Sequence, residues 1–113
     1  MSNPGFYPES ITSLPQIEVP FDNVVGYLLQ GVDSQSVFFE LAKGSHVPPH
    51  SHEAQWGVLL DGELELSIGQ ETHVFKKGAS YFIPEGVVHG GRALTDCKVL
   101  DVFFTPARYQ AKK

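Results

Sequence analysis

The sequence predicts an all-β protein, built as a small sandwich or barrel of short antiparallel strands. Runs of β-branched and aromatic residues recur along the chain, Gly- and Pro-containing turns separate them at close spacing, and no stretch carries a helical period. Closing or doubling a sheet in this way hides most unpaired backbone groups. The 113 residues suffice for one domain with one core. We expect an arm at 1–23, with a possible edge strand, and a single domain at 24–113.

The N-terminal half holds the less regular part of the pattern. Pro and Ser are frequent in the arm, and its short apolar patch at 17–19 is the candidate edge strand. Strands are expected next at 24–29 and 36–42, with a hairpin turn between them at 31–33. Pro48 and Pro49 cannot donate to a strand ladder, so the chain around them should run along a sheet edge or be irregular.

From residue 55 onward the alternation is regular. Leu64, Leu66 and Ile68 alternate with polar residues, which indicates a strand with one buried face. Gly- and Pro-containing turns delimit the neighbouring strands. Strands are therefore expected over 55–60, 63–68, 71–75, 80–83 and 98–104, with a further segment beginning at Val88 and His89. Because the inward faces of such strands converge, residues far apart in the sequence become neighbours inside the domain.

Composition narrows the classes of partner. The net charge is −5 and no basic stripe occurs, so nucleic acid is not an expected partner. No stretch approaches a membrane span, and the first residues lack a basic end followed by an apolar run, so we expect a cytoplasmic protein without membrane contact. Cys97 is the single cysteine, which excludes an internal disulfide, and its strand-like neighbours indicate a buried, inert thiol.

Two histidines separated by one residue form the clearest candidate site. On an extended chain His50 and His52 point the same way, while the residue between them points the other way. If the chain then turns into the next strand, the amide of Gln55 can reach the same point. An imidazole pair with a third polar group indicates a cation site. His46 and His73, in a loop and on a polar hairpin, are interpreted as ordinary surface or core histidines.

The spacing around this histidine pair resembles the two motifs of the cupin superfamily. The first motif is carried by Gly44, His50, His52, Gln55 and Gly62, and the second by Gly78, Pro84, Gly86 and His89. The resemblance spans roughly residues 36–104 and implies a cupin-type jelly-roll barrel that forms a homodimer. It also implies that one divalent transition metal (Zn, Ni, Fe, Mn or Cu) is bound by His50, His52, Gln55 and His89. The alternative is a barrel that keeps this geometry without a metal.

Two positions depart from the cupin pattern. Gln55 stands where cupins commonly carry a glutamate, and Ala93 takes the place of a closing asparagine. Glu53 is the alternative carboxylate, but it faces the other way on an extended chain. With Gln55 the protein supplies no negative ligand, so the ion keeps its full positive charge, which favours an anionic ligand and weakens metal retention. Three histidines and one glutamine leave coordination positions open, as in a catalytic site.

After its first residue, Lys98, the last predicted strand is apolar on both faces apart from Asp101. Asp101 is therefore expected to be enclosed, and an enclosed carboxylate either has a partner or shows a raised pKa. In the mouth of a barrel such a residue is a candidate general acid or base. The alternative is a structural ion pair between Asp101 and Arg92 or Arg108.

A narrower resemblance concerns the chemistry. The His-Ser-His, Gln-x-Gly and Asp-Val-Phe sequences, with a Pro and an Arg soon after, resemble the small cupins of pectin and alginate degradation, which open the ring of 4,5-unsaturated monouronates. The resemblance implies that Asp101 transfers a proton, that Phe103 contacts the substrate and that Arg108 clamps a carboxylate, although Arg108 stands one residue further from Asp101 than the pattern has it. We therefore expect a metal-dependent enzyme that acts on a small anionic sugar acid or keto acid.

Two other functions fit the same residues. A dioxygenase that uses Fe, Cu or Ni is compatible with a three-histidine site. A non-catalytic cupin that binds a small sugar ligand is the other alternative. Trp56 lies next to Gln55 on the opposite face of its strand, where barrel packing or a dimer contact is expected rather than substrate stacking.

Overall fold

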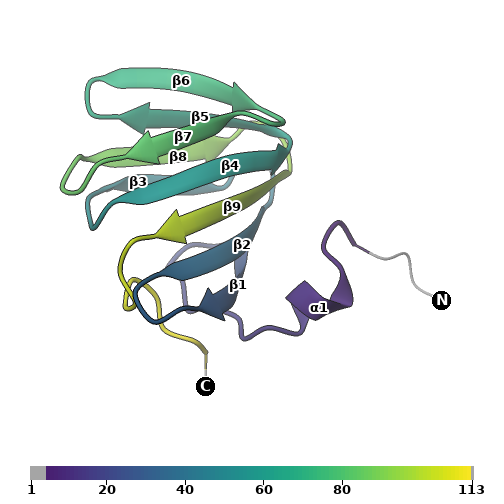
Figure 1. Ribbon diagram of the computed structural model, residues 1–113. Coiled ribbons are helices and arrows are strands. Elements are labelled where there is room, and N and C mark those ends of the chain that lie inside the picture. The colour runs from purple at the N-terminus through teal and green to yellow at the C-terminus, as the bar shows by residue number, and fades with distance from the viewer. Residues whose placement is uncertain (1–4, 113) are drawn as a thin grey trace.

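Two antiparallel sheets make up the protein (Figure 1). A computed structural model describes residues 5–112. The elements in chain order are α1 (Glu9–Thr12), β1 (Val24–Gln30), β2 (Gln35–Leu41), β3 (His46–His50), β4 (Gln55–Asp61), β5 (Glu63–Ile68), β6 (Glu71–Lys76), β7 (Ser80–Ile83), β8 (His89–Ala93) and β9 (Cys97–Phe103). One sheet has the order β1-β2-β9-β4-β7, and the other has the order β3-β8-β5-β6. The all-β jelly-roll class is thus confirmed, with the strands divided between two hydrogen-bonded sheets.

Strand β9 is the centre of the five-stranded sheet, between β2 and β4. Its residues alternate between buried and partly exposed, as a half-buried strand requires, and Asp101 falls on the buried face. In register with Asp101 are Val37 on β2 and Gly57 on β4. The carboxylate is therefore placed in the interior of the molecule, between the two sheets.

Strand β3 is an edge of the four-stranded sheet, as the two prolines predict. It pairs with β8 from His46 to His50, but the register shifts between Val47 and His50, where Pro48 and Pro49 lie. Beyond this irregularity His50 stands opposite His89. The irregular edge therefore brings the last residue of β3 next to the first residue of β8.

The core lies between the two sheets and draws on both. Its largest fully buried hydrophobic side chains are those of Phe103, Ile17, Leu59, Ile83, Val37 and Val99. Ile17 belongs to the N-terminal arm, where Gln16 and Ile17 make isolated bridges to Tyr27 and Ala111. Burying such side chains stabilises a fold by about 1.5–3 kcal/mol each.

The arm also contains an element that the sequence pattern does not predict. Helix α1 is four residues long and begins after Pro8, whose carbonyl accepts hydrogen bonds from the amides of Ile11 and Thr12. A single turn is too short to display a hydrophobic period, so pattern reasoning misses it. Tyr7, just before it, is buried, and its hydroxyl donates a hydrogen bond to the carbonyl of Phe39 at 2.8 Å.

The outer face of the five-stranded sheet is partly apolar. Trp56 on β4 is 37% exposed and stands in register with Phe82 on β7, which is 54% exposed. Trp56 is thus directed away from the interior, which rules out stacking on a ligand between the sheets, and a dimer contact there stays a prediction. Within residues 5–112, the only helix, α1, falls far short of the length and hydropathy needed to cross a bilayer.

Candidate metal centre

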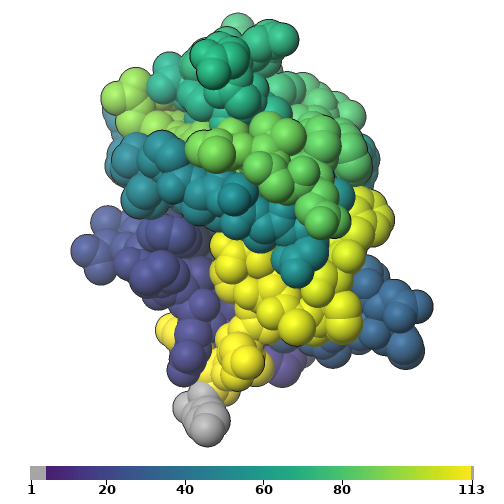
Figure 2. Space-filling model, turned by 90° about the vertical axis from the view of Figure 1, so that its left-hand side faces the viewer, coloured from purple at the N-terminus to yellow at the C-terminus, as the bar shows by residue number. Residues whose placement is uncertain are grey.

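Three histidines from two parts of the chain meet at one end of the molecule. His50 ends β3, His52 lies in the connection to β4, and His89 begins β8. Their ligand nitrogens all lie within 4.8 Å of one another. Figure 2 views this end, at which the C-terminal segment, in yellow, lies beside the teal segment that leads into β4. The amide of Phe104 donates a hydrogen bond to the carbonyl of Ala54 at 2.9 Å and joins these two segments.

The backbone determines which nitrogen of each imidazole faces its neighbours. In each ring Nδ1 is bonded to a backbone carbonyl oxygen: that of Pro48 for His50 at 2.9 Å, that of Glu53 for His52 at 2.7 Å, and that of Val87 for His89 at 2.9 Å. Because a carbonyl oxygen only accepts hydrogen bonds, Nδ1 carries the proton in each neutral ring. The three Nε2 atoms are therefore left with lone pairs, the form that binds a metal.

The distance between two of these nitrogens fits a shared cation. Nε2 of His52 and Nε2 of His89 are 3.2 Å apart. Two lone pairs at that distance repel each other unless a proton or a cation lies between them. Nitrogens bound to one ion at about 2.0–2.1 Å, with angles between octahedral and tetrahedral, are about 2.8–3.4 Å apart. Burial lowers the pKa of His52 to about 4 and also lowers that of His89, so both rings are neutral near pH 7.

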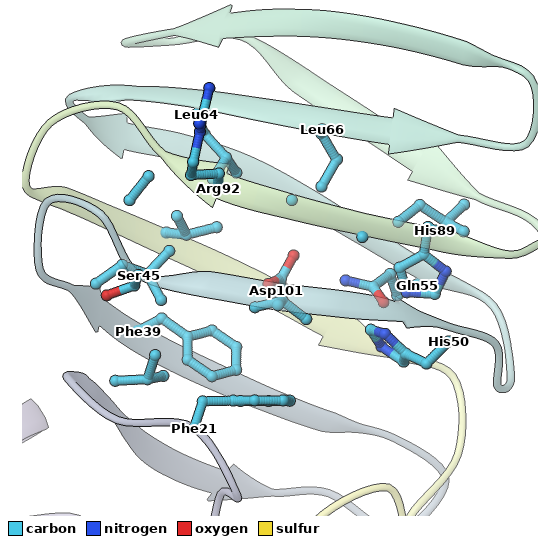
Figure 3. Close-up of a pocket in the computed structure, with 18 of the residues that line it drawn as sticks. Phe21, Phe39, Ser45, His50, Gln55, Leu64, Leu66, His89, Arg92 and Asp101 are labelled. Carbon is cyan, nitrogen blue, oxygen red and sulfur yellow. The ribbon is translucent and has the colours of Figure 1, made fainter.

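Gln55 adds an oxygen that lacks a partner. Its side chain is buried, with 6% exposure, and its Oε1 has no hydrogen-bond partner among the described residues. Figure 3 shows the amide nitrogen on the side of Asp101 and the oxygen on the side of the histidines. An orphaned buried oxygen of this kind is costly, by about 1–3 kcal/mol. A cation held by the three histidines would satisfy it, so the residues present fit a metal ion.

Asp101 is held by two donors inside the protein. The hydroxyl of Tyr81 donates a hydrogen bond to Oδ1 of Asp101 at 2.7 Å, and the side-chain amide of Gln55 donates another. Burial raises the pKa of Asp101 to about 6, although both hydrogen bonds oppose the shift. A carboxylate in this range can take up and release a proton near neutral pH.

The structure gives Asp101 other partners than the arginines considered from the sequence. Arg92 lies 3.5 Å from the carboxylate of Glu65, and the guanidinium of Arg108 lies over the ring of Tyr109 at 4.4 Å. Among the ion pairs of the described residues, none involves Asp101. The hydrogen bond from Tyr81 takes the place of the ion pair that was the alternative interpretation of Asp101.

Tyr81 is the site residue that sequence reasoning missed. Gly57 of β4 is in register with Tyr81 on one side and with Asp101 on the other. A Cβ atom added at Gly57 would collide with the Asp101 carboxylate and with the Tyr81 ring and hydroxyl. A glycine within a strand often marks a close approach by a neighbouring group, and that signal points to this pair.

Phe103 and Arg108 both lie near the histidines. The ring of Phe103 is buried and stands 5.6 Å from that of His52, and it also packs on Tyr109. Arg108 lies near enough for its positive charge to contribute to the lowered pKa of His52 and of His89, and its Nε is buried without a hydrogen-bond partner. Their predicted contacts with a substrate stay predictions.

His46 and His73 lie outside the three-histidine cluster, and both are exposed. His73 pairs with Glu71 at 3.0 Å on β6. Glu53, the alternative carboxylate, is exposed, and its backbone carbonyl, not its carboxylate, contacts His52.

Fold and site together define a class of protein: a small jelly roll with a three-histidine group, able to hold a metal ion, between its sheets. The protein-family model described as the cupin domain matches residues 37–103 of this chain, so the chain belongs to the cupin family. A curated relative, the H2HPP isomerase of Bacillus subtilis, is 31% identical over 72 residues. That match takes in 62% of this chain but only 30% of the relative.

Solved structures show the same fold. KdgF from Halomonas sp. superposes with a TM-score of 0.73 at 25% identity, over 81% of this chain and 88% of that one. An RmlC-like cupin from Shewanella frigidimarina superposes with a TM-score of 0.76 at 24% identity, over 94% of each chain. A variant of oxalate decarboxylase from Bacillus subtilis gives a TM-score of 0.74 at 19% identity, over 84% of this chain and 28% of that one.

Proposed function

We propose that this cupin is a metal-dependent enzyme that moves a proton on a small anionic keto acid or sugar acid, either by tautomerisation or by opening the ring of an unsaturated uronate. The observation that carries the proposal is that the three histidines, the orphaned Gln55 oxygen and the buried Asp101 carboxylate all line one cavity, with Asp101 further in than the histidines (Figure 3). A cation site beside a buried acid or base is the arrangement that proton transfer next to a carbonyl requires.

The metal would be held by the three histidines and Gln55. A divalent ion there would supply positive charge that stabilises negative charge on a carboxylate or enol oxygen. Because imidazoles and an amide are all neutral, nothing in this ligand set reduces that charge. The identity of the ion among Zn, Ni, Fe, Mn and Cu is open, and Mn(II) centres are named for the oxalate decarboxylase of Bacillus subtilis.

Side chains of the protein would transfer the proton and bind the carboxylate of the substrate. In a tautomerisation, Asp101 would take the proton from the carbon beside the carbonyl, while the electron pair of the broken C–H bond forms a C=C bond and the carbonyl pair moves to oxygen. Where the substrate carries a further C=C bond in conjugation, return of the proton to the far carbon completes an isomerisation without any oxidant. In a ring opening, the anomeric hydroxyl would lose its proton and form the C=O bond as the ring C–O bond breaks, and Asp101 would protonate the carbon end of the enolate that is released. The positive charge of Arg108 acts on His52 and His89 and would attract the carboxylate of the substrate.

The comparisons support an isomerase in two ways. The curated relative is itself named an isomerase. KdgF is among the similar structures, and the last strand of this chain resembles the small cupins of pectin and alginate degradation.

The test is an Asp101→Asn variant with the same metal content as the parent. Turnover of a 4,5-unsaturated monouronate, or deuterium exchange beside the carbonyl of a 2-oxo acid in D₂O, should fall by about 10²–10⁴-fold if Asp101 is the acid and base. Asp61→Asn is the matched control, because Asp61 is exposed at the far end of β4. Unchanged turnover in Asp101→Asn would remove Asp101 from the mechanism, and oxygen uptake by the parent would favour a dioxygenase.

A further inference from the structure

A cavity runs between the two sheets from the metal centre into the interior. Figure 3 shows its extent: His50, Gln55 and His89 lie at one end, Asp101 lies in the middle, and Phe21 and Ser45 lie at the other end. Its volume is about 80 Å³. Most of its lining is apolar and includes side chains of Val24, Phe39, Leu41, Leu64, Leu66 and Val99.

Polar side chains of this inner part are already engaged. The Ser45 hydroxyl donates to the carbonyl of Ala42 at 2.6 Å. The Tyr81 hydroxyl donates to Asp101. Arg92 directs its charge to Glu65, and its side chain is 54% exposed, so the charge lies outside the cavity. Apart from the Asp101 carboxylate and the Tyr109 hydroxyl, the groups able to bind a polar ligand therefore lie at the metal end.

This distribution determines what the cavity can accept. A hydroxyl group placed among these aliphatic walls loses its hydrogen bonds to water without replacement, which costs about ten-fold in affinity for each group. A methylene group placed there is removed from water, which raises the affinity about four-fold. The inner cavity thus disfavours the several hydroxyl groups of a sugar acid and favours a hydrocarbon substituent.

The volume sets the size of that substituent. An engineered cavity of about 150 Å³ lined by Leu, Ile and Phe binds benzene. The whole cavity here, the metal end included, is about 80 Å³, about half that volume. The inner part is smaller still, so an aromatic ring does not fit there and the substituent has to be a short aliphatic chain.

We propose that the substrate is a 2-oxo acid with a short branched aliphatic chain, which lies in the inner cavity while the oxo and carboxylate oxygens face the metal centre. The inference rests on the proposed function, and it selects the keto acid over the sugar acid. The specificity would then be decided by the walls of the cavity, since the metal centre contacts groups that all 2-oxo acids share.

Affinity measurements decide this proposal independently of catalysis. Binding of pyruvate, of 4-methyl-2-oxopentanoate and of a 4,5-unsaturated monouronate to the metal-loaded protein is measured by calorimetry. The branched acid carries three more carbons than pyruvate, so it should bind about 60-fold more tightly, at about four-fold for each buried carbon. Equal affinity for the two 2-oxo acids, or tighter binding of the monouronate, would overturn the proposal.

A cavity-filling variant checks where the chain lies. Ala93 is buried in the wall, so Ala93→Val should weaken binding of 4-methyl-2-oxopentanoate by at least ten-fold and leave that of pyruvate within two-fold. Ala42→Val is the matched control, since Ala42 is exposed and lies outside the cavity. Equal weakening of both acids by Ala93→Val would contradict this placement.

Deuterium exchange on the same samples separates the two proposals. Tight, selective binding of the branched acid without exchange would uphold the binding specificity and refute the enzymatic function. Deuterium exchange that is fastest with the monouronate would support the enzymatic function and refute the preference for a 2-oxo acid with an aliphatic chain.

Discussion

Replacing Gly57 by alanine tests how the interior of the site is assembled. Gly57 lies on β4 between Asp101 and Tyr81, and its backbone conformation is one that alanine also adopts. In an open position of a strand, alanine would stabilise the protein by about 0.4–1 kcal/mol, because it restricts the unfolded chain. Here the added Cβ would collide with the Asp101 carboxylate and with Tyr81, so we expect alanine to destabilise the protein instead.

The magnitude follows from the two interactions at risk. Overpacking a filled interior costs about 1–3 kcal/mol. Separating the Tyr81 hydroxyl from the Asp101 carboxylate, now 2.7 Å apart, loses a charge-assisted hydrogen bond of about 1.5–3 kcal/mol. Since a movement that relieves the collision weakens the hydrogen bond, we expect a net loss of about 2–4 kcal/mol. That is a large part of the free energy of unfolding of an ordinary domain, about 5–15 kcal/mol.

Urea denaturation of the metal-free protein measures this loss without any contribution from metal binding. With a slope of about 2 kcal/mol per molar urea, the midpoint of Gly57→Ala should fall by about 1–2 M. Gly5→Ala is the control, because no heavy atom lies within 4 Å of a Cβ at that position. A Gly57→Ala protein as stable as the parent would refute the close approach of Asp101 and Tyr81 to Gly57.

Three further predictions concern single residues. Gln55→Glu should bind a divalent metal at least ten-fold more tightly, because a carboxylate adds negative charge next to the ion; equal affinity, measured by competition with a chelator, would count against Gln55 as a ligand. Tyr81→Phe should lower the free energy of unfolding by about 1.5–3 kcal/mol, because it leaves the Asp101 carboxylate without its hydroxyl donor, and chemical denaturation would show no change if that hydrogen bond is unimportant. Cys97 is buried, and its burial raises the pKa of the thiol, so a disulfide reagent should modify it only on unfolding; rapid modification of the native protein would show an accessible thiol.

Much of the strand pattern was predictable because it is local. The alternation of Leu64 and Leu66 with polar residues reports one buried face, and β5 occupies the residues expected from it. The prolines at 48 and 49 correctly predicted an edge strand with broken register. The division of the strands between two sheets was not predictable, since it depends on pairing between distant segments such as β2 and β9.

The candidate site was predictable where a motif describes it and not elsewhere. The spacing of His50, His52 and His89 led to a cluster that the structure assembles. The partners of Asp101 were not predictable, because Tyr81 reaches it across β4 through the space left by a glycine. The apolar inner cavity was missed as well, since an alternating strand pattern identifies buried side chains but not the empty volume between them.

The candidate metal ligands are oriented in two different ways, and this determines which of them mutation can change. Each imidazole is oriented by a carbonyl of the main chain, and no side-chain replacement deletes that acceptor. Gln55 is oriented by Asp101, which is in turn held by Tyr81, so its orientation depends on side chains that mutation can change. The orientation of the histidines therefore depends on the backbone path, whereas that of Gln55 is open to change by mutation. Redesign of the metal preference should begin at residue 55 and its two supports, with the histidines left in place.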